Sequence, residues 1–156
     1  TPTVANVRPT SRGEINIVSN DSREYPKIKM NYLSTEDDRH VAALGLKIIR
    51  KIMLETETFK KYEPEEYRPG IHIQDNEELV KAASDYAQTI FHPVGTCKMG
   101  SDDHSVVNDK LSVHGIENLR VIDASIMPNI TSGNTNAPTI MIAEKGSDMI
   151  LNGPNV

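Results

Sequence analysis

Two short stretches near the start of the chain alternate polar and apolar residues. Residues 14–17 and 27–30 both show this two-residue period, which is typical of strands with one wet face. The turn-rich segment SNDSREYP lies between them. We therefore predict a hairpin or a pair of adjacent strands in this region.

The next pattern has a helical period. Four apolar residues recur at intervals that place them on one helix face: Val41, Leu44, Ile48 and Ile52. Ser34 supplies a capping hydroxyl, and the acidic residues that follow suit the positive end of a helix. We predict an amphipathic helix from about Thr35 to Leu54.

A second helix follows a charged, proline-punctuated connection, ETETFKKYEPEEYRPG. Asp75 with Glu78 three residues later forms a variant of the capping box, which marks a helix start. This helix should end near Thr89. It carries apolar residues at suitable positions: Leu79, Ala82, Ala83 and Tyr86.

The last third of the chain predicts a short strand, a turn and a final helix. Leu119 to Asp123 reads as a buried strand that ends in an acid. The final helix should run from about Ala137 to Leu151, because Asn136 suits the N-cap and Pro138 suits the first turn. Its apolar residues are Ile140, Met141, Ala143, Met149 and Ile150.

Composition limits the class of protein. A length of 156 residues suits one domain or part of a larger one. The net charge of -5 gives no electrostatic footprint for nucleic acid. We expect no membrane span, because no apolar run approaches the required length. The chain has neither an initiator Met nor a signal-peptide pattern. A single Cys excludes an internal disulfide and fits a reducing compartment, so we expect a cytoplasmic location.

The segment FHPVGTCKMG, residues 91–100, concentrates chemically versatile residues. Its two glycines have the spacing of a nucleotide-binding loop, but Ser101 and Asp102 stand where that motif requires Lys and then Ser or Thr. A metal site would draw on His92, Cys97 and His104, whose spacing matches no structural zinc pattern. A Cys97 nucleophile stays open, although a lone cysteine is more often a small buried hydrophobe.

Two loops carry complementary chemistry. His92 lies in the first, and the amides Asn134 and Asn136 lie in a second loop that leads into the final helix. Each residue taken alone has an ordinary structural interpretation in a turn or a helix cap. Together they favour a catalytic site, because imidazole transfers protons near neutral pH and a carboxamide can hold an alcohol oxygen without competing for its proton.

Three segments, in this order, resemble the C-terminal part of the glucose-methanol-choline (GMC) oxidoreductases. They are FHPVGTCKMG at 91–100, LRVIDASIMP at 119–128, and GNTNAPT at 133–139 followed by Glu144-Lys145. Residues 7–13 and 31–34 resemble the family as well, so the likeness covers nearly the whole chain. Within the family, the sequence is most similar to choline-dehydrogenase-like alcohol dehydrogenases.

The resemblance implies a flavoenzyme that oxidises an alcohol by hydride transfer to N5 of FAD. It assigns His92 as the proton acceptor and Asn134 as the second catalytic residue. It also assigns five residues to the flavin: Asp123, Ala124, Asn136, Ala137 and Pro138. The helix that opens at Asn136 suits this role, since its N-terminal N–H groups favour the negative charge that develops on a reduced flavin.

The same resemblance predicts a partial α+β fold. Residues 1–88 would supply antiparallel strands and helices of the substrate-binding domain, and residues 89–156 would close the FAD-binding α/β domain. No Gly-x-Gly-x-x-Gly occurs in the sequence, so an N-terminal FAD-binding portion, in the same or a separate chain, is the expected partner. The isolated chain should be inactive. A non-catalytic domain of the same descent and a hydroxynitrile lyase on the same scaffold remain alternatives.

Overall fold

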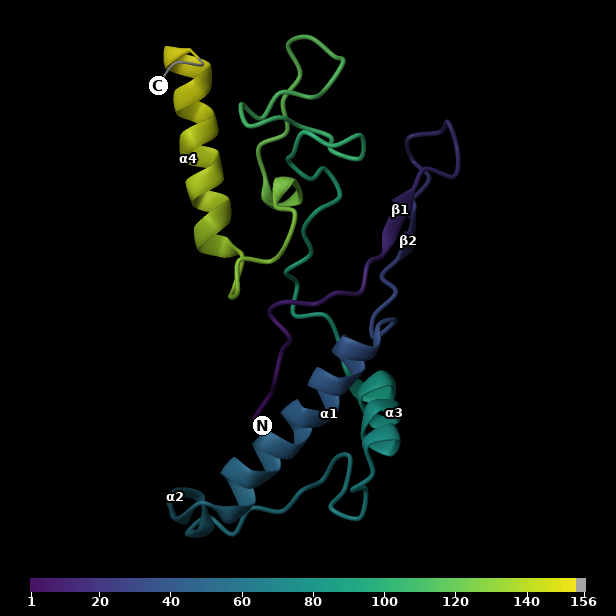
Figure 1. Cartoon of the computed structure of the whole chain (residues 1–156), viewed down its shortest axis with the longest axis vertical. Coiled ribbons are helices and arrows are strands. Elements are labelled where there is room, and N and C mark those ends of the chain that lie inside the picture. The colour runs from purple at the N-terminus through teal and green to yellow at the C-terminus, as the bar shows by residue number, and fades with distance from the viewer. Residues whose placement is uncertain (154–156) are drawn as a thin grey trace. The chain divides into compact units, whose positions relative to one another are not determined.

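A computed structural model describes residues 1–153 of the chain (Figure 1). The chain divides into two compact units, Thr1–Ile90 and the residues from Phe91 onward. The predicted α+β class is confirmed, because helices occur with a two-stranded antiparallel sheet. The functional division at residues 88 and 89 stays a prediction.

The sheet of the first unit is a hairpin. Strand β1 (Glu14–Asn16) pairs antiparallel with β2 (Lys27–Lys29), and Ile15 lies opposite Ile28. Both strands are exposed along their whole length. The predicted pairing is therefore confirmed, whereas the expectation of only one wet face is wrong for the residues that the structure describes.

Helix α1 (Glu36–Arg50) continues into a π-helical turn, η1 (Lys51–Glu55), and a short helix α2 (Glu57–Lys60) follows. The predicted extent to Leu54 is thus close to the observed one. The predicted cap is displaced by one residue, since Thr35 and not Ser34 is the N-cap, with its side chain accepting a hydrogen bond from Asp38 N. Ser34 instead donates its backbone N–H to Ser11 Oγ.

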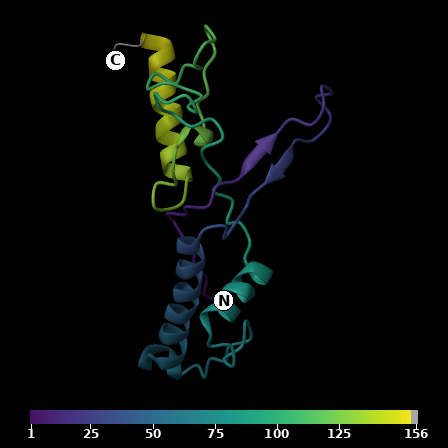
Figure 2. The same cartoon turned by 45° about the vertical axis from the view of Figure 1, so that its right-hand side comes forward.

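Helix α3 (Asn76–Tyr86) packs beside α1, as both views show (Figures 1 and 2). The predicted cap is confirmed, because the Asp75 carboxylate accepts hydrogen bonds from the N–H groups of Glu77 and Glu78. The helix ends at Tyr86, short of Thr89. Its buried residues, Leu79 and Ala82, are two of those the periodicity predicted.

The apolar stripe that predicted α1 does not face the interior of the first unit. Its members are at least 40% exposed: Val41, Leu44, Ile48 and Ile52. Helix α1 buries Ala43 and Gly45 together with two charged residues, Asp38 and Arg50. Small side chains allow close packing, and the two charges are satisfied by dense hydrogen bonding.

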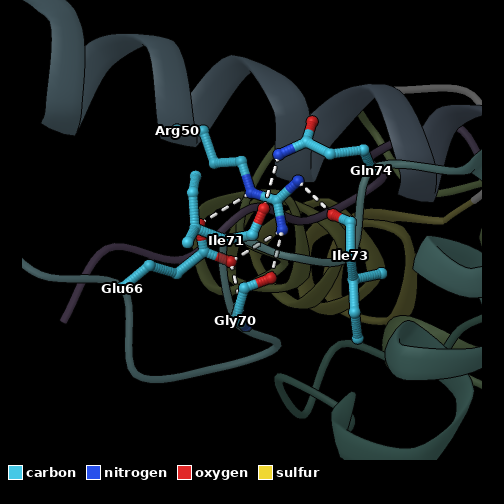
Figure 3. Close-up of polar contacts among 6 residues, drawn as sticks. All are labelled: Arg50, Glu66, Gly70, Ile71, Ile73 and Gln74. Atoms are coloured by element: carbon cyan, nitrogen blue, oxygen red, sulfur yellow. Dashed lines mark hydrogen bonds and ion pairs between the residues drawn. The ribbon is translucent and has the colours of Figure 1, made fainter.

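Arg50 forms the more extensive of these two networks (Figure 3). Its guanidinium makes two hydrogen bonds to the Glu66 carboxylate, at 2.7 and 2.8 Å. It also donates to the carbonyls of Ile73 and Gly70. Both charged side chains are about nine-tenths buried, so this pair fixes the irregular segment before α3 onto the end of α1.

Asp38 fixes the start of the chain in a similar way. Its carboxylate is 4% exposed and accepts hydrogen bonds from the backbone N–H groups of Thr10 and Ser11, at 2.9 and 2.8 Å. Asn6 donates a third at 3.1 Å. Burial raises the pKa of Asp38, but the hydrogen bonds from Ser11 and Thr10 outweigh it and hold the pKa below its usual value.

The second unit is built mostly from irregular segments around one small core. The buried members of that core are Val107, Leu111, Ile126, Met127 and Ile142. The predicted strand from Leu119 to Asp123 is wrong. Arg120 pairs with Ser112 in an isolated bridge, so the pairing does not extend into a strand. The turn predicted after this segment is present as a 3₁₀ turn, η2 (Ala124–Ile126), and the Asp123 carboxylate caps it by accepting the Ser125 N–H.

Helix α4 (Asn136–Asn152) is the last element of the second unit among the described residues, and Gly153 is its C-cap. Thr135, and not Asn136, occupies the N-cap position. Ile142 and Gly146 are the buried residues, whereas three of the predicted apolar positions are more than half exposed: Ile140, Met141 and Ile150. No helix within residues 1–153 is both long and apolar enough to span a bilayer.

Candidate active site

The first loop of the site positions His92. Phe91, just before it, has a left-handed backbone with φ of 63°, which is uncommon for a bulky residue and turns the chain sharply. Beyond His92, the backbone N–H groups of Gly95 and Cys97 both donate to the carbonyl of Ser125, at 3.0 and 3.1 Å. The histidine loop is therefore fastened to η2 in the core of the second unit.

The second loop positions Asn134 and Thr135. Ser132 also has a left-handed backbone, with φ of 62°. Asn134 is exposed, Thr135 is only 7% exposed, and α4 begins at the next residue. The Thr135 carbonyl accepts hydrogen bonds from the N–H and the hydroxyl of Thr139, at 3.0 and 2.6 Å. This loop is thus anchored to the first turn of α4.

The two loops meet at the imidazole ring. Asn134 Nδ2 lies 2.8 Å from His92 Nε2. On the other side of the ring, Thr135 Oγ1 lies 2.9 Å from Nδ1, and the Thr135 backbone N–H approaches the same nitrogen at 3.5 Å. His92 is half-buried. The structure therefore brings together the two residues predicted to be catalytic and adds Thr135 to them.

The start of α4 presents polar backbone groups next to this pair. Thr135 is the N-cap, but its hydroxyl contacts His92 and does not bond to the helix N–H groups. Asn136 and Ala137 are exposed, and Pro138 is half-buried. An N-terminus with free N–H groups carries about half a positive charge and favours an electron-rich ligand.

Asp123 and Ala124 lie in the segment that supports the histidine loop. Asp123 is exposed and its carboxylate accepts the Ser125 N–H at 2.7 Å. Ala124 is half-buried against the core. Because Ser125 accepts hydrogen bonds from Gly95 and Cys97, a shift of η2 would also move the loop that carries His92.

The other candidates of the histidine segment have structural contacts. Cys97 is a free, half-buried cysteine. Lys98 pairs with Asp102 at 3.1 Å. Hydrogen bonds from Ser105 and then from Lys98 lower the pKa of Asp102 to about 2. Within residues 1–153, no group of three His, Cys, Asp or Glu side chains is arranged to hold a metal ion.

Thr135 is the residue that sequence reasoning missed. It stands between Asn134, which is predicted to be catalytic, and Asn136, which is predicted to be the N-cap and a flavin contact. A hydroxyl directly before a helix was a usable signal, because threonine is a favoured N-cap. Its contact with a histidine 43 residues away could not be read from local pattern.

Comparisons with known proteins show which family the chain resembles. A family profile described as GMC oxidoreductase matches residues 9–143. The chain is 50% identical over 147 residues to the oxygen-dependent choline dehydrogenase of Proteus mirabilis, and 48% identical to that of Pectobacterium atrosepticum. Each match covers 94% of this chain and 26% of the relative, so the chain spans about a quarter of the length of these relatives.

Several solved structures also align with more than nine-tenths of this chain. Pyridoxine 4-oxidase from Mesorbium loti aligns with a TM-score of 0.86 and 33% identity, covering 92% of this chain and 28% of the other. Formate oxidase from Aspergillus oryzae aligns with a TM-score of 0.85 and 34% identity, over 92% of this chain and 25% of the other. An FAD-dependent oxidoreductase from Chaetomium thermophilum aligns with a TM-score of 0.88 and 27% identity, over 94% of this chain and 25% of the other.

Proposed function

Because the chain belongs to the GMC oxidoreductase family, we propose that it is the C-terminal part of an FAD-dependent enzyme that oxidises an alcohol to an aldehyde or ketone. The observation that carries this proposal is the 2.8 Å approach of Asn134 Nδ2 to His92 Nε2, which joins two distant loops. The curated relatives are named choline dehydrogenases, so choline is the first alcohol to test.

The residues present fit a flavin. The first turn of α4 has exposed residues and an N-cap whose hydroxyl is turned away from the helix, which leaves N–H groups for an electron-rich ring edge. In this proposal Asn136, Ala137 and Pro138 would hold that edge. Asp123 and Ala124 would contribute a further contact. FAD supplies the hydride acceptor when it is bound.

His92 and Asn134 would act on the oxygen of the substrate. The Nε2 lone pair of His92 accepts the hydroxyl proton, so the O–H bond breaks and the imidazole becomes positively charged. On substrate binding, the Asn134 amide would leave Nε2 and donate a hydrogen bond to the same oxygen as negative charge develops there. With its proton on His92 and its oxygen held by Asn134, the alcohol would be set to lose a hydride from its carbon and become a carbonyl compound, and a bound flavin would supply the acceptor for that hydride.

The exposed apolar residues support a larger assembly. Val41, Leu44 and Ile48 on α1 lie at the surface of the first unit, and Ile140 and Met141 lie at the surface of the second. Large apolar side chains that gather at a protein surface often mark contact surfaces. We assign residues 1–88 to the substrate-binding domain and 89–156 to the end of the FAD-binding domain, with the N-terminal portion covering these faces.

The test uses the complete enzyme that contains this chain. The purified protein should show the visible absorbance of oxidised flavin, and anaerobic addition of choline or another alcohol should bleach it. A protein without flavin would favour a non-catalytic domain of the same descent. A flavin that no alcohol bleaches, together with cleavage of a cyanohydrin, would favour a hydroxynitrile lyase.

A further inference from the structure

Thr135 departs from the usual behaviour of a helix N-cap. Such a residue normally has an extended backbone and places its side-chain oxygen on the N–H groups of the first turn. Thr135 has φ of -83° and ψ of -3°, and its hydroxyl lies 2.9 Å from His92 Nδ1. Helix α4 therefore lacks a side-chain cap at Thr135, and the hydroxyl contacts His92 instead.

The surroundings of Thr135 hold this hydroxyl in place. The residue is 7% exposed, and its carbonyl is bound by both polar groups of Thr139. A side chain held by packing and by a rigid helix keeps a defined position. The hydroxyl is therefore a fixed partner for the imidazole ring.

The position of the single proton on a neutral His92 ring determines the role of the Thr135 hydroxyl. A neutral imidazole has one N–H donor and one lone pair. Asn134 contacts Nε2 through its amide nitrogen, which can only donate, so Nε2 is the acceptor. The ring proton then lies on Nδ1 and is donated to Thr135 Oγ1 at 2.9 Å. The Thr135 backbone N–H, at 3.5 Å from Nδ1, is too distant to compete strongly.

We propose that Thr135 is a positioning residue that holds His92 in the tautomer with its proton on Nδ1. Nε2 then keeps its lone pair, which the Asn134 amide occupies in this structure and which the substrate hydroxyl would take over on binding. This inference rests on the proposed function, because it concerns the proton transfer assigned to His92. Loss of the hydroxyl would leave the ring free to turn and to place its proton on Nε2, where it blocks the base.

The kinetic test compares Thr135→Val with Thr135→Ser in the flavin-loaded complete enzyme. Valine keeps the shape and removes the hydroxyl, whereas serine keeps the hydroxyl. We expect flavin reduction by alcohol to slow by about tenfold to a hundredfold in Thr135→Val and by less than about threefold in Thr135→Ser. Equal rates in the wild type and Thr135→Val would overturn the proposal.

A second measurement does not depend on turnover or on any substitution of Thr135. Nitrogen-15 NMR of histidine-labelled wild-type enzyme, with the His92 signals assigned by their loss in His92→Gln, reports which ring nitrogen carries the proton. We expect the proton on Nδ1. A proton on Nε2 would mean that the Asn134 amide presents its oxygen to the ring, and the proposal would be wrong.

The two proposals fail in different ways. A wild-type enzyme whose flavin no alcohol reduces contradicts the proposed function. A wild-type enzyme that is reduced, a His92→Gln variant that is not, and a Thr135→Val variant that matches the wild type contradict only the role of Thr135.

Discussion

Asn134 Nδ2 lies 2.8 Å from His92 Nε2 although 42 residues separate them along the chain. The histidine loop is held by hydrogen bonds to Ser125, and the asparagine loop is anchored to α4 through Thr135. Ile126 of η2 and Ile142 of α4 share one core. The contact is therefore a consequence of how the second unit folds.

Replacing Asn134 tests how much its amide contributes to the rate of flavin reduction. We expect Asn134→Ala to slow flavin reduction by about a hundredfold, because one donor to a developing alkoxide is lost. Flavin content should stay at the wild-type level, since Asn134 is exposed and buries little surface. Stopped-flow absorbance of the complete enzyme measures the rate.

Asn134→His is the matched control, because histidine can also donate a hydrogen bond to the substrate oxygen. This variant should retain most of the rate. An Asn134→Ala enzyme as fast as the wild type would show that the amide takes no part in the reaction.

The Arg50–Glu66 pair should make stability depend on pH. The hydrogen bond from Arg50 lowers the pKa of Glu66 below its usual value of 4.5. A carboxylate whose pKa is lower in the folded state stabilises the protein above that usual value, and its contribution is lost as the pH falls through the folded-state pKa. Acid unfolding of the wild type should show this loss, and Glu66→Gln should reduce it.

Glu66→Gln should also lower the unfolding free energy near neutral pH. Glu66→Gln leaves the buried Arg50 charge unpaired, which costs about 3 kcal/mol in unfolding free energy. Glu57→Gln is the control, since Glu57 pairs with Lys60 on the surface and is 88% exposed. Loss of this surface pair should change the unfolding free energy by less than about 1 kcal/mol. Comparable denaturant midpoints for the two variants would contradict the importance of the buried network.

Two buried helix glycines should respond differently to alanine. A Cβ at Gly146 would lie 2.5 Å from Ile122 Cγ2 and 3.2 Å from Leu111 Cδ1. Leu111 belongs to the core of the second unit and Ile122 packs against it, so overpacking should cost about 1 to 3 kcal/mol and exceed the helix-propensity gain of about 1 kcal/mol. Thermal unfolding of Gly146→Ala should therefore begin at a lower temperature.

Gly45→Ala provides the comparison. Its Cβ would meet the side chain of Val4 at 2.9 Å, but Val4 is 50% exposed and near the start of the chain, so it can move aside. This substitution should be neutral or stabilising. A destabilised Gly45→Ala with a neutral Gly146→Ala would reverse the expected order.

The exposed stripe on α1 should be buried in the complete enzyme. Ile48 is 57% exposed within the first unit. If the N-terminal portion covers it, Ile48→Glu should lower the unfolding free energy by about 2 kcal/mol or more, whereas Ile48→Leu should cost less than about 1.5 kcal/mol. Denaturant unfolding of the two variants measures the difference, and an unchanged Ile48→Glu would show that this face stays in water.

Local signals in the sequence predicted the elements that depend on local chemistry. Helical spacing located α1, α3 and α4, and the Asp75 cap was read correctly because its acceptor and donors are close in sequence. The family motifs pointed to His92 and Asn134. The turn predicted after Asp123 is present as η2, which the Asp123 carboxylate caps. The strand predicted before Asp123 is absent, because apolar periodicity alone does not supply a pairing partner.

Other features depend on contacts between distant segments. The burial of Asp38 and Arg50 follows from partners 16 to 32 residues away, and a single charged residue in a helix gives no sign of them. The stripe on α1 was correctly placed on one face, but periodicity does not tell whether that face is covered within the same unit. Thr135 was missed because its partner lies in another loop.

The role of His92 is tested most directly by the rate at which an alcohol reduces the flavin of the complete enzyme in a single anaerobic turnover, with and without His92. We predict that His92→Gln binds flavin normally and is reduced at least about a hundredfold more slowly than the wild type. Reduction of His92→Gln at the wild-type rate would contradict the assignment of His92 as the proton acceptor.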